Sequence, residues 1–156
     1  MVLVDRAIQD VREMSQLLRP TILDDFGLDA ALRSLTESFS QRTGIKVEYR
    51  SNKDGRRWKD DAETNLYRIA QEALTNVARH SQATLVNIDL EESGGSLTLQ
   101  IRDNGRGLDP DTSKKSSGLG LAGMQTRARG CGGNLRLQSD PGKGLRIEVT
   151  CPLDKV

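Results

Sequence analysis

Residues 66–81, with the sequence LYRIAQEALTNVARHS, carry apolar side chains at the spacing of one helical face. Side chains three and four positions apart lie on the same side of a helix, so this run predicts a helix with one buried face. The apolar positions are Leu66, Ile69, Ala70, Ala73, Leu74 and Val77. The polar positions opposite them are Arg68, Glu72, Asn76, Arg79 and His80. This stripe combines a carboxylate, an amide oxygen and cationic groups, which suits Mg²⁺ bound together with phosphates.

A polar stripe is also typical of an ordinary solvated helix face, and two glycine-rich segments decide between these interpretations. Residues 96–103 predict a strand that ends at Asp103, and Gly105 and Gly107 follow in a loop where glycine permits unusual backbone angles. A second segment precedes another helical pattern and consists of Gly118, Leu119, Gly120 and Leu121. Unpaired N–H groups and the dipole at a helix N-terminus favour phosphate, so the combination predicts a nucleotide site.

These segments resemble the ATP-binding domain of sensor histidine kinases, within the wider family of DNA gyrase B, the heat-shock chaperone ATPases and MutL-type repair proteins. QEALTNVARHS at 71–81 is similar to the N box of that family, DNGRG at 103–107 to its G1 box, and SGLGLAGM at 117–124 to its G2 box. DPGKGLRIEVTCPL at 140–153 resembles its last glycine segment and closing strand. The motifs occur in the order and spacing of the family, and the resemblance covers nearly the whole chain.

The segment before these motifs narrows the resemblance. Residues 17–50 are similar to the segment that precedes the ATP-binding domain in the nitrate-sensor and DesK-like kinases. A helical apolar stripe ends near Pro20, and it resembles the second helix of a dimerisation hairpin. We therefore expect residues 1–26 to be a remnant of the dimerisation and phosphotransfer hairpin, and 27–156 to be the ATP-binding catalytic domain. The resemblance implies that the chain is a fragment without the helix of the phosphoacceptor histidine.

The resemblance implies an α/β (α+β) fold, a two-layer Bergerat-type sandwich with a mixed sheet and helices on one face. Adjacent strands joined by short turns independently require antiparallel pairs. Expected helices extend to Leu18, from Leu28 to Gly44, from Asp60 to His80 and from Leu119 to Arg129. Expected strands cover 45–50, 84–92, 96–103, 134–139 and 145–152, with a turn at 20–27 and a polar loop at 108–117.

The resemblance also implies roles for single residues. Asp103 matches the aspartate that accepts a hydrogen bond from the adenine amino group, and Gly105 and Gly107 would let the backbone approach the base. Asn76 matches the magnesium ligand. Glu72 matches the acid proposed to take a proton from the attacking group, so it is the candidate general base.

Further positions are assigned to the phosphates or to the base. Arg79 and His80 are expected near the phosphates, and residues 118–121 are expected to wrap them. For Met124, core packing and an adenine wall are both open. Leu145 departs from the family, which often has a small hydroxyl residue there, and this puts ATP affinity in doubt. The Arg106 side chain could reach a phosphate or only solvent, and exposure to solvent is the default expectation.

Composition restricts the partners and the location. The net charge of +1 and the 3% of aromatic residues argue against nucleic-acid binding. No apolar run reaches the roughly twenty residues that a membrane span needs. Cys131 and Cys151 lack the spacing of metal ligands, so we expect reduced thiols and a cytoplasmic location. Whether the parent kinase is anchored in a membrane stays open.

The function that this resemblance implies is that of the ATP-binding catalytic domain of a two-component sensor histidine kinase, a protein histidine kinase with ATP and Mg²⁺ as cofactors. His80 is the only histidine, and it resembles a residue that contacts the bound nucleotide, so no autophosphorylation is expected without the acceptor helix. A response regulator and a homodimeric parent are the implied partners. The alternatives are an anti-sigma factor kinase-like module, against which residues 18–28 argue, and an ATPase of the gyrase or chaperone type.

Overall fold

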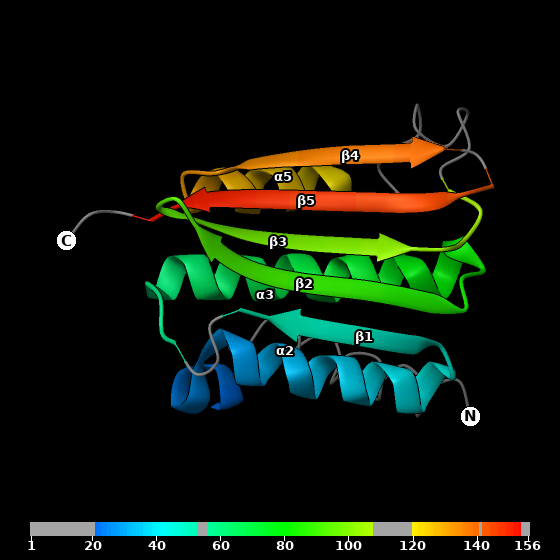
Figure 1. Ribbon diagram of the computed structural model, residues 1–156, viewed down its shortest axis with the longest axis horizontal. Coiled ribbons are helices and arrows are strands. Elements are labelled where there is room, and N and C mark those ends of the chain that lie inside the picture. The colour runs from blue at the N-terminus through cyan, green and yellow to red at the C-terminus, as the bar shows by residue number, and fades with distance from the viewer. Residues whose placement is uncertain (1–20, 53–55, 108–119, 141, 154–156) are drawn as a thin grey trace, which may run out of the picture.

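The structure is a computed structural model that describes residues 21–52, 56–107, 120–140 and 142–153. The helix expected before Leu18 and the loop expected at 108–117 lie outside the described residues, as do Gly118 and Leu119. The helices, labelled as in Figure 1, are α2 (Thr21–Thr43), α3 (Asp60–Asn76), the π-helix η1 (Val77–Ser81) and α5 (Leu121–Gly130). The strands are β1 (Lys46–Ser51), β2 (Leu85–Ser93), β3 (Ser96–Asp103), β4 (Asn134–Asp140) and β5 (Gly144–Pro152).

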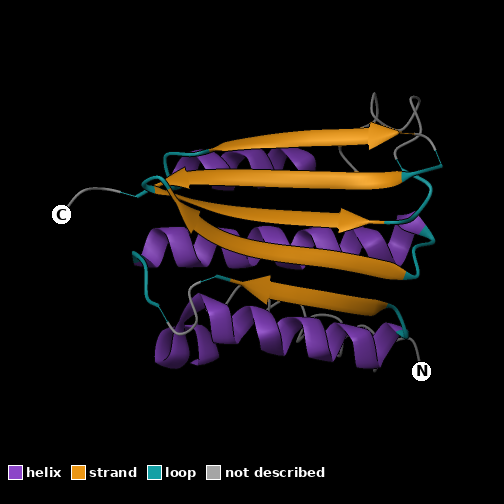
Figure 2. Ribbon diagram, in the orientation of Figure 1, coloured by secondary structure: helices purple, strands orange, loops and turns teal. Residues whose placement is uncertain are grey.

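These strands form one mixed sheet in the order β1-β2-β3-β5-β4. β1 pairs with β2 in parallel, and the other three pairs are antiparallel. α3 and α5 lie behind the sheet in Figures 1 and 2, and α2 lies along the β1 edge, where it contacts β1 and α3. The helices therefore cover one face of the sheet, and the other face is open. The predicted α/β architecture of two layers with a mixed sheet is therefore confirmed.

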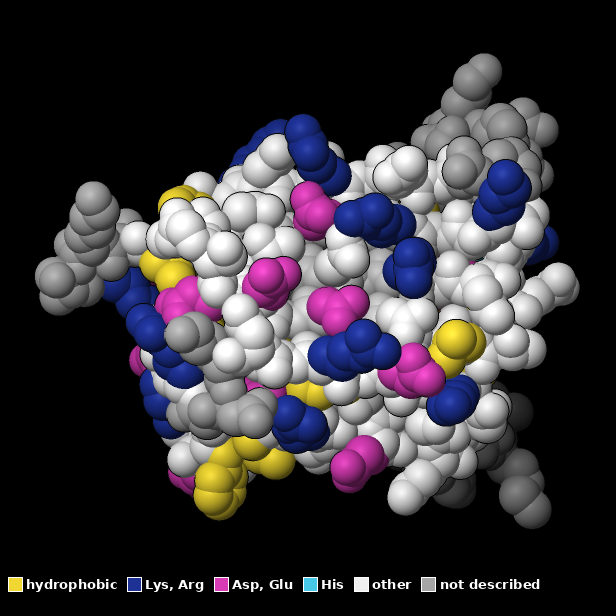
Figure 3. Space-filling view, viewed as in Figure 1, with side chains coloured by type: hydrophobic (Ala, Val, Ile, Leu, Met, Phe, Trp, Pro, Cys, Tyr) yellow, Lys and Arg dark blue, Asp and Glu magenta, His cyan; other side chains and the backbone are white. Residues whose placement is uncertain are grey.

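The core lies between the sheet and the helices because each strand alternates its side chains between two faces. Along β2 and β3 the inward positions are buried, namely Val86, Ile88, Leu90, Leu97, Leu99 and Ile101. The predicted apolar face of α3 packs against them through Leu66, Ile69, Ala70, Ala73 and Leu74. The outward positions are polar, and Figure 3 shows Lys, Arg, Asp and Glu side chains mixed over this open face. One such contact joins Gln100 Nε2 to Glu148 Oε2 at 3.2 Å.

The turn expected at 20–27 is wrong over its described part, because α2 already begins at Thr21. The helix is interrupted at Gly27, whose φ of 87° and ψ of −176° are non-helical. A left-handed φ is accessible to glycine at little cost. The segment before this kink folds as helix because Leu23 is fully buried in the core, so burial decides where composition suggested a turn.

The single helix expected from Asp60 to His80 also differs from the structure. The α-helical part of this segment ends at Asn76, and a π-helical turn follows until Gln82 adopts a left-handed φ of 56°. Ser81 closes that turn, since its Oγ donates to the Val77 carbonyl at 2.8 Å and accepts from the Ala83 amide at 3.0 Å. Single π-helical turns occur frequently at functional sites.

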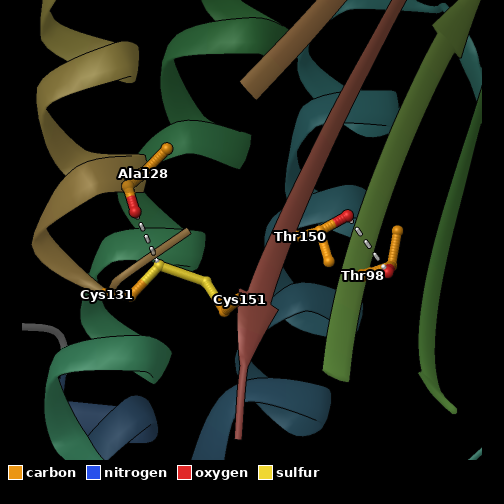
Figure 4. Close-up of a disulfide and its surroundings, with 5 residues drawn as sticks. All are labelled: Thr98, Ala128, Cys131, Thr150 and Cys151. Carbon is orange, nitrogen blue, oxygen red and sulfur yellow. Dashed lines mark hydrogen bonds between the residues drawn. A yellow bond between two sulfur atoms is a disulfide. The ribbon is translucent and has the colours of Figure 1, made fainter. Parts of the chain in front are cut away.

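The expectation of reduced thiols is wrong, because Cys131 and Cys151 form a disulfide. Figure 4 shows this bond joining the C-terminal end of α5 to β5. The Cα atoms are 5.9 Å apart, although 20 positions separate the two residues along the chain. Neither residue has a nearby sequence signal for this pairing, which depends on how α5 packs beside β5.

Reduction of the disulfide is expected to lower the free energy of unfolding by about 3 kcal/mol, because the bond closes a loop of some twenty residues in the unfolded chain. Urea unfolding with and without a thiol reductant measures the difference. The double variant Cys131→Ser with Cys151→Ser is the control, and its stability should not respond to reductant. Two results together would contradict the pairing. The wild type would unfold at the same urea concentration with and without reductant, and the denatured protein without reductant would contain two free thiols.

Candidate nucleotide-binding site

A cavity lies where β3 ends and β5 begins, beside η1 and the first residue of α5. In Figure 1 this is the end of the sheet toward which the β3 arrow points. Its lining residues are Ala73, Asn76, Val77, His80, Ser81, Ile101, Asp103, Gly107, Leu121, Leu145 and Ile147. Apolar side chains form most of the wall, and a few polar groups converge on it, as is usual for small-molecule sites.

Asp103 is the buried carboxylate of this cavity, with only 6% of its surface exposed. Its Oδ1 accepts hydrogen bonds from the Gly105 amide at 2.8 Å and from the Leu145 amide at 3.4 Å. Within the described residues, no hydrogen bond to Oδ2 is found. Burial raises the pKa of the Asp103 carboxyl, and the two amide hydrogen bonds oppose that rise. One carboxylate oxygen is thus fixed by the protein, and the other remains for a ligand.

Two glycines allow the segments around Asp103 to pack closely. A Cβ added to Gly144 would overlap the Asp103 backbone carbonyl, and Gly144 also has a left-handed φ of 99°. A Cβ added to Gly105 would overlap the Ser81 carbonyl. Gly105 therefore brings the loop against η1, and its expected role in letting the backbone approach the base stays a prediction. Gly107, with a φ of 75°, does line the cavity.

The remaining predicted residues divide into two groups. Asn76, His80 and Leu121 line the cavity together with Asp103. Glu72, Arg79 and Met124 are not among its lining residues. Arg79 is exposed, and Met124 is 1% exposed and packs in the core.

Glu72 lies against Gly120, the residue before the cavity-lining Leu121. A Cβ added to Gly120 would overlap its Oε1, so the carboxylate lies against the glycine that precedes α5. Gly120 has a left-handed φ of 65°, and that conformation together with the missing side chain leaves room for Glu72. The structure therefore places the candidate general base beside one described glycine of the predicted G2 segment.

Sequence reasoning missed several wall residues because their apolar side chains were expected only to form the core. Ala73, Val77, Ile101 and Ile147 do belong to the core cluster, yet they also face the cavity. Ser81 was missed as well, although it ends the QEALTNVARHS run. Leu145 serves in two ways, because its amide holds Asp103 and its side chain adds to the wall.

Arg106 faces solvent, as expected, and it also forms hydrogen bonds to the end of η1. Although the residue is exposed, its Nε donates to the His80 carbonyl at 2.6 Å, and its amide donates to the Ser81 carbonyl at 2.8 Å. The DNGRG loop is therefore bonded to the end of η1 on the cavity side.

Comparison with known proteins agrees with this geometry. Residues 61–155 match the family described as histidine kinase-, DNA gyrase B- and HSP90-like ATPases. The chain is 36% identical over 151 residues to the oxygen sensor histidine kinase NreB of Staphylococcus carnosus, covering 97% of this chain and 44% of that relative. The chain thus spans less than half the length of this curated relative.

Solved structures show the same fold at lower identity. The blue-light activated histidine kinase EL346 of Erythrobacter litoralis has a TM-score of 0.70 and 22% identity, over 81% of this chain and 42% of that one. A nucleotide-free catalytic domain of the histidine kinase ThkA has a TM-score of 0.65 and 15% identity, over 81% of this chain and 90% of that one.

The chain belongs to the family of histidine kinase-, DNA gyrase B- and HSP90-like ATPases. Within that family, its sequence and fold are those of the ATP-binding catalytic domain of a sensor histidine kinase.

Proposed function

We propose that the cavity binds Mg-ATP with the adenine against Asp103 and that the parent protein transfers the γ-phosphoryl group to a histidine outside this chain. The observation that carries this proposal is the hydrogen bonding of the two Asp103 carboxylate oxygens. Oδ1 is held by two backbone amides, while no described residue donates a hydrogen bond to Oδ2, in a cavity whose wall is mostly apolar. An acceptor in such a place suits a flat base that presents an N–H group.

The same carboxylate supports selection of adenine over guanine. The adenine amino group would donate to Oδ2, whereas guanine presents a carbonyl oxygen at the corresponding position. Two acceptors facing each other in a buried site leave both unsatisfied, at a cost of roughly 1–3 kcal/mol. The side chains of Val77, Ile101 and Ile147 supply apolar walls for the faces and edges of the ring.

Polar groups at the η1 side of the cavity suit the phosphates. Asn76 offers an amide oxygen, which would be the protein ligand of Mg²⁺, and His80 lines the same wall. Among the described residues no group of three or more His, Cys, Asp or Glu side chains could hold a metal ion. Mg²⁺ commonly uses one or two protein oxygens together with phosphates and waters, so this sparse set fits it.

Transfer of the phosphoryl group is a proposal for the parent protein. Bound Mg-ATP supplies an activated γ-phosphoryl group, and catalysis then depends mainly on positioning and charge stabilisation. We propose Glu72 as the general base because its carboxylate lies beside Gly120, the residue before the cavity-lining Leu121. Arg79 and residues 118–121 are proposed to contact the phosphates.

The partners and the location are proposals as well. A response regulator would receive the phosphoryl group from the parent histidine, and the parent would act as a homodimer. Nucleic-acid binding is not proposed, given a net charge of +1. In residues 21–52, 56–107, 120–140 and 142–153 no helix is long and apolar enough to cross a membrane. We propose a cytoplasmic location, where the Cys131–Cys151 pair would be exposed to reduction.

The chain is expected to bind Mg-ATP saturably and Mg-GTP about 5- to 150-fold more weakly, because only adenine donates to Asp103. Calorimetric titration of both nucleotides measures the ratio. Phosphate release is measured in parallel, and we expect none at steady state. Equal affinity for the two nucleotides would refute the base assignment, and steady release of phosphate would favour an ATPase of the gyrase or chaperone type.

A further inference from the structure

We propose that Arg106 is a positioning residue of the nucleotide site, because it fixes the π-helical turn that carries His80 and Ser81. The inference rests on the proposed ATP site, since these two residues form part of the cavity wall. Arg106 itself is not among the lining residues, so it acts through the backbone that it holds.

The C-terminal end of η1 is held by Arg106. The last carbonyls of a helix have no partner within the helix. Here the His80 carbonyl accepts from Arg106 Nε at 2.6 Å, and the Ser81 carbonyl accepts from the Arg106 amide at 2.8 Å. A single residue of the DNGRG loop therefore satisfies two consecutive carbonyls at the C-terminal end of the turn.

The positive charge of the Arg106 side chain also stabilises the contact with the end of η1. Carbonyl oxygens at a helix C-terminus carry the negative end of the helix dipole, so a cation there is favourable. A guanidinium also donates a charge-assisted hydrogen bond, which is stronger than a neutral one. Arginine at position 106 thus suits the His80 carbonyl better than a neutral side chain would.

Hydrogen bonds to the β4–β5 connection and to the start of β2 fix the loop around Arg106. Gly142 donates from its amide to the Arg106 carbonyl at 2.8 Å, which ties the loop to the β4–β5 connection. Asn104 Oδ1 accepts from the Thr84 amide at 2.9 Å and the Leu85 amide at 3.0 Å. Gly105 permits close approach to Ser81, because a Cβ there would overlap the Ser81 carbonyl. A fixed loop can hold η1 in place.

The Arg106 contacts fix the position of the His80–Ser81 wall relative to Asp103, and this position affects ligand binding. Asp103 is the last residue of β3 and Arg106 follows it by three positions, so the base contact and the His80–Ser81 wall are joined through few bonds. Loss of the Arg106 side chain would free the His80 carbonyl and let the imidazole leave its place at the cavity. The Asp103 contacts, which use the Gly105 and Leu145 amides, would remain.

The test uses the fact that His80 is the only histidine of the chain, so its imidazole gives one unambiguous pair of ring signals in a ¹H–¹³C NMR spectrum. In Arg106→Ala we expect these signals to move toward the values of a free histidine, and ATP to bind about 3- to 10-fold more weakly. Arg106→Lys keeps the positive charge and should restore part of both effects. Arg102→Ala removes an exposed arginine of β3 and serves as the matched control that changes neither.

The outcomes separate this inference from the proposed function. Unchanged His80 signals and unchanged ATP affinity in Arg106→Ala would overturn the positioning role. The NMR measurement needs no nucleotide, so it remains decisive when ATP is absent. A wild type that binds no ATP, while Arg106→Ala still shifts the His80 signals, would refute the proposed ATP site and leave the contact between Arg106 and η1 supported. If Arg106→Ala unfolds globally, its signals lose dispersion across the whole NMR spectrum. The His80 signals and the ATP affinity are then compared between the wild type and Arg106→Lys.

Discussion

Replacing Asp103 by asparagine is expected to weaken Mg-ATP binding by about 5- to 150-fold, which corresponds to roughly 1–3 kcal/mol for an unsatisfied buried polar group. The reason is that a carboxylate accepts through both oxygens, while an amide has one acceptor and one donor. If the amide oxygen keeps the Gly105 and Leu145 N–H groups, its NH₂ faces the adenine amino group. If the amide turns around, its NH₂ faces the two backbone amides instead. Either orientation sets donor against donor.

Calorimetric titration of Mg-ATP into the wild type and into Asp103→Asn measures this loss. The variant should stay folded, because its amide oxygen can keep the acceptor role toward the loop. Circular dichroism and a urea titration check that point. An affinity for ATP equal to that of the wild type would mean that the base does not contact Asp103, and the cavity would need a different ligand or a different orientation of the nucleotide.

The pH dependence of binding gives an independent check of the same contact. Burial raises the pKa of the Asp103 carboxyl. Only the ionised carboxylate accepts through both oxygens, so ATP affinity should fall as the pH drops through that raised pKa, and recover above it. Asp103→Asn has no such group and should lack this component of the pH profile. A profile shared by the two proteins would assign the titration to some other group.

Replacing Glu63 by alanine is expected to lower the free energy of unfolding by about 3–5 kcal/mol, the usual effect of removing one partner of a buried ion pair. Glu63 is fully buried. Its Oε2 accepts from the Leu28 amide at 3.2 Å and from the Trp58 amide at 3.4 Å, and its Oε1 accepts from Arg57 Nη2 at 3.2 Å. Alanine would leave two buried amides without acceptors and Arg57 without its anion.

The position of these contacts explains why one side chain has so large an effect. Leu28 follows the kink at Gly27, and Arg57 also donates to the Leu23 and Asp24 carbonyls at the end of the helical turns before it. Glu63 therefore holds the two parts of α2 against the start of α3. Because Arg57 is itself 44% exposed, water can replace part of its contact, which favours the lower end of the expected range.

Urea unfolding of Glu63→Ala, Glu63→Gln and Glu91→Ala tests this expectation. Glutamine keeps an acceptor of similar shape but loses the charge, so its loss should be smaller, about 1–3 kcal/mol. Glu91 is exposed on β2, and its removal should change stability by less than about 0.5 kcal/mol. A loss below 1 kcal/mol in Glu63→Ala would show that the buried carboxylate is not held as the structure describes.

Most of the element order could be predicted because the signals are local. The apolar spacing of Leu66, Ile69 and Ala73 defines one buried helix face, and the alternation along β2 and β3 defines which face of the sheet is covered. Asp103 and Gly107 were found from a short motif, and both line the cavity. Local signals failed at Thr21–Gly27 and after Asn76, where burial of Leu23 and the closing contacts of Ser81 decide the backbone conformation.

The sequence by itself determined the apolar faces of the helices and strands and the motif residues, because periodicity and glycine placement act over a few neighbouring positions. The two-layer fold followed from the resemblance of those motifs to a known family and not from the periodicity. The tertiary structure alone decided which distant groups meet. The amide of Leu145 reaches Asp103 across 42 positions, Glu63 reaches Leu28 across 35, and Cys131 reaches Cys151 across 20. The hydrophobic periodicity of a helix or strand shows which side chains are buried. The residues that they contact depend on how whole elements pack, and no local pattern contains that information.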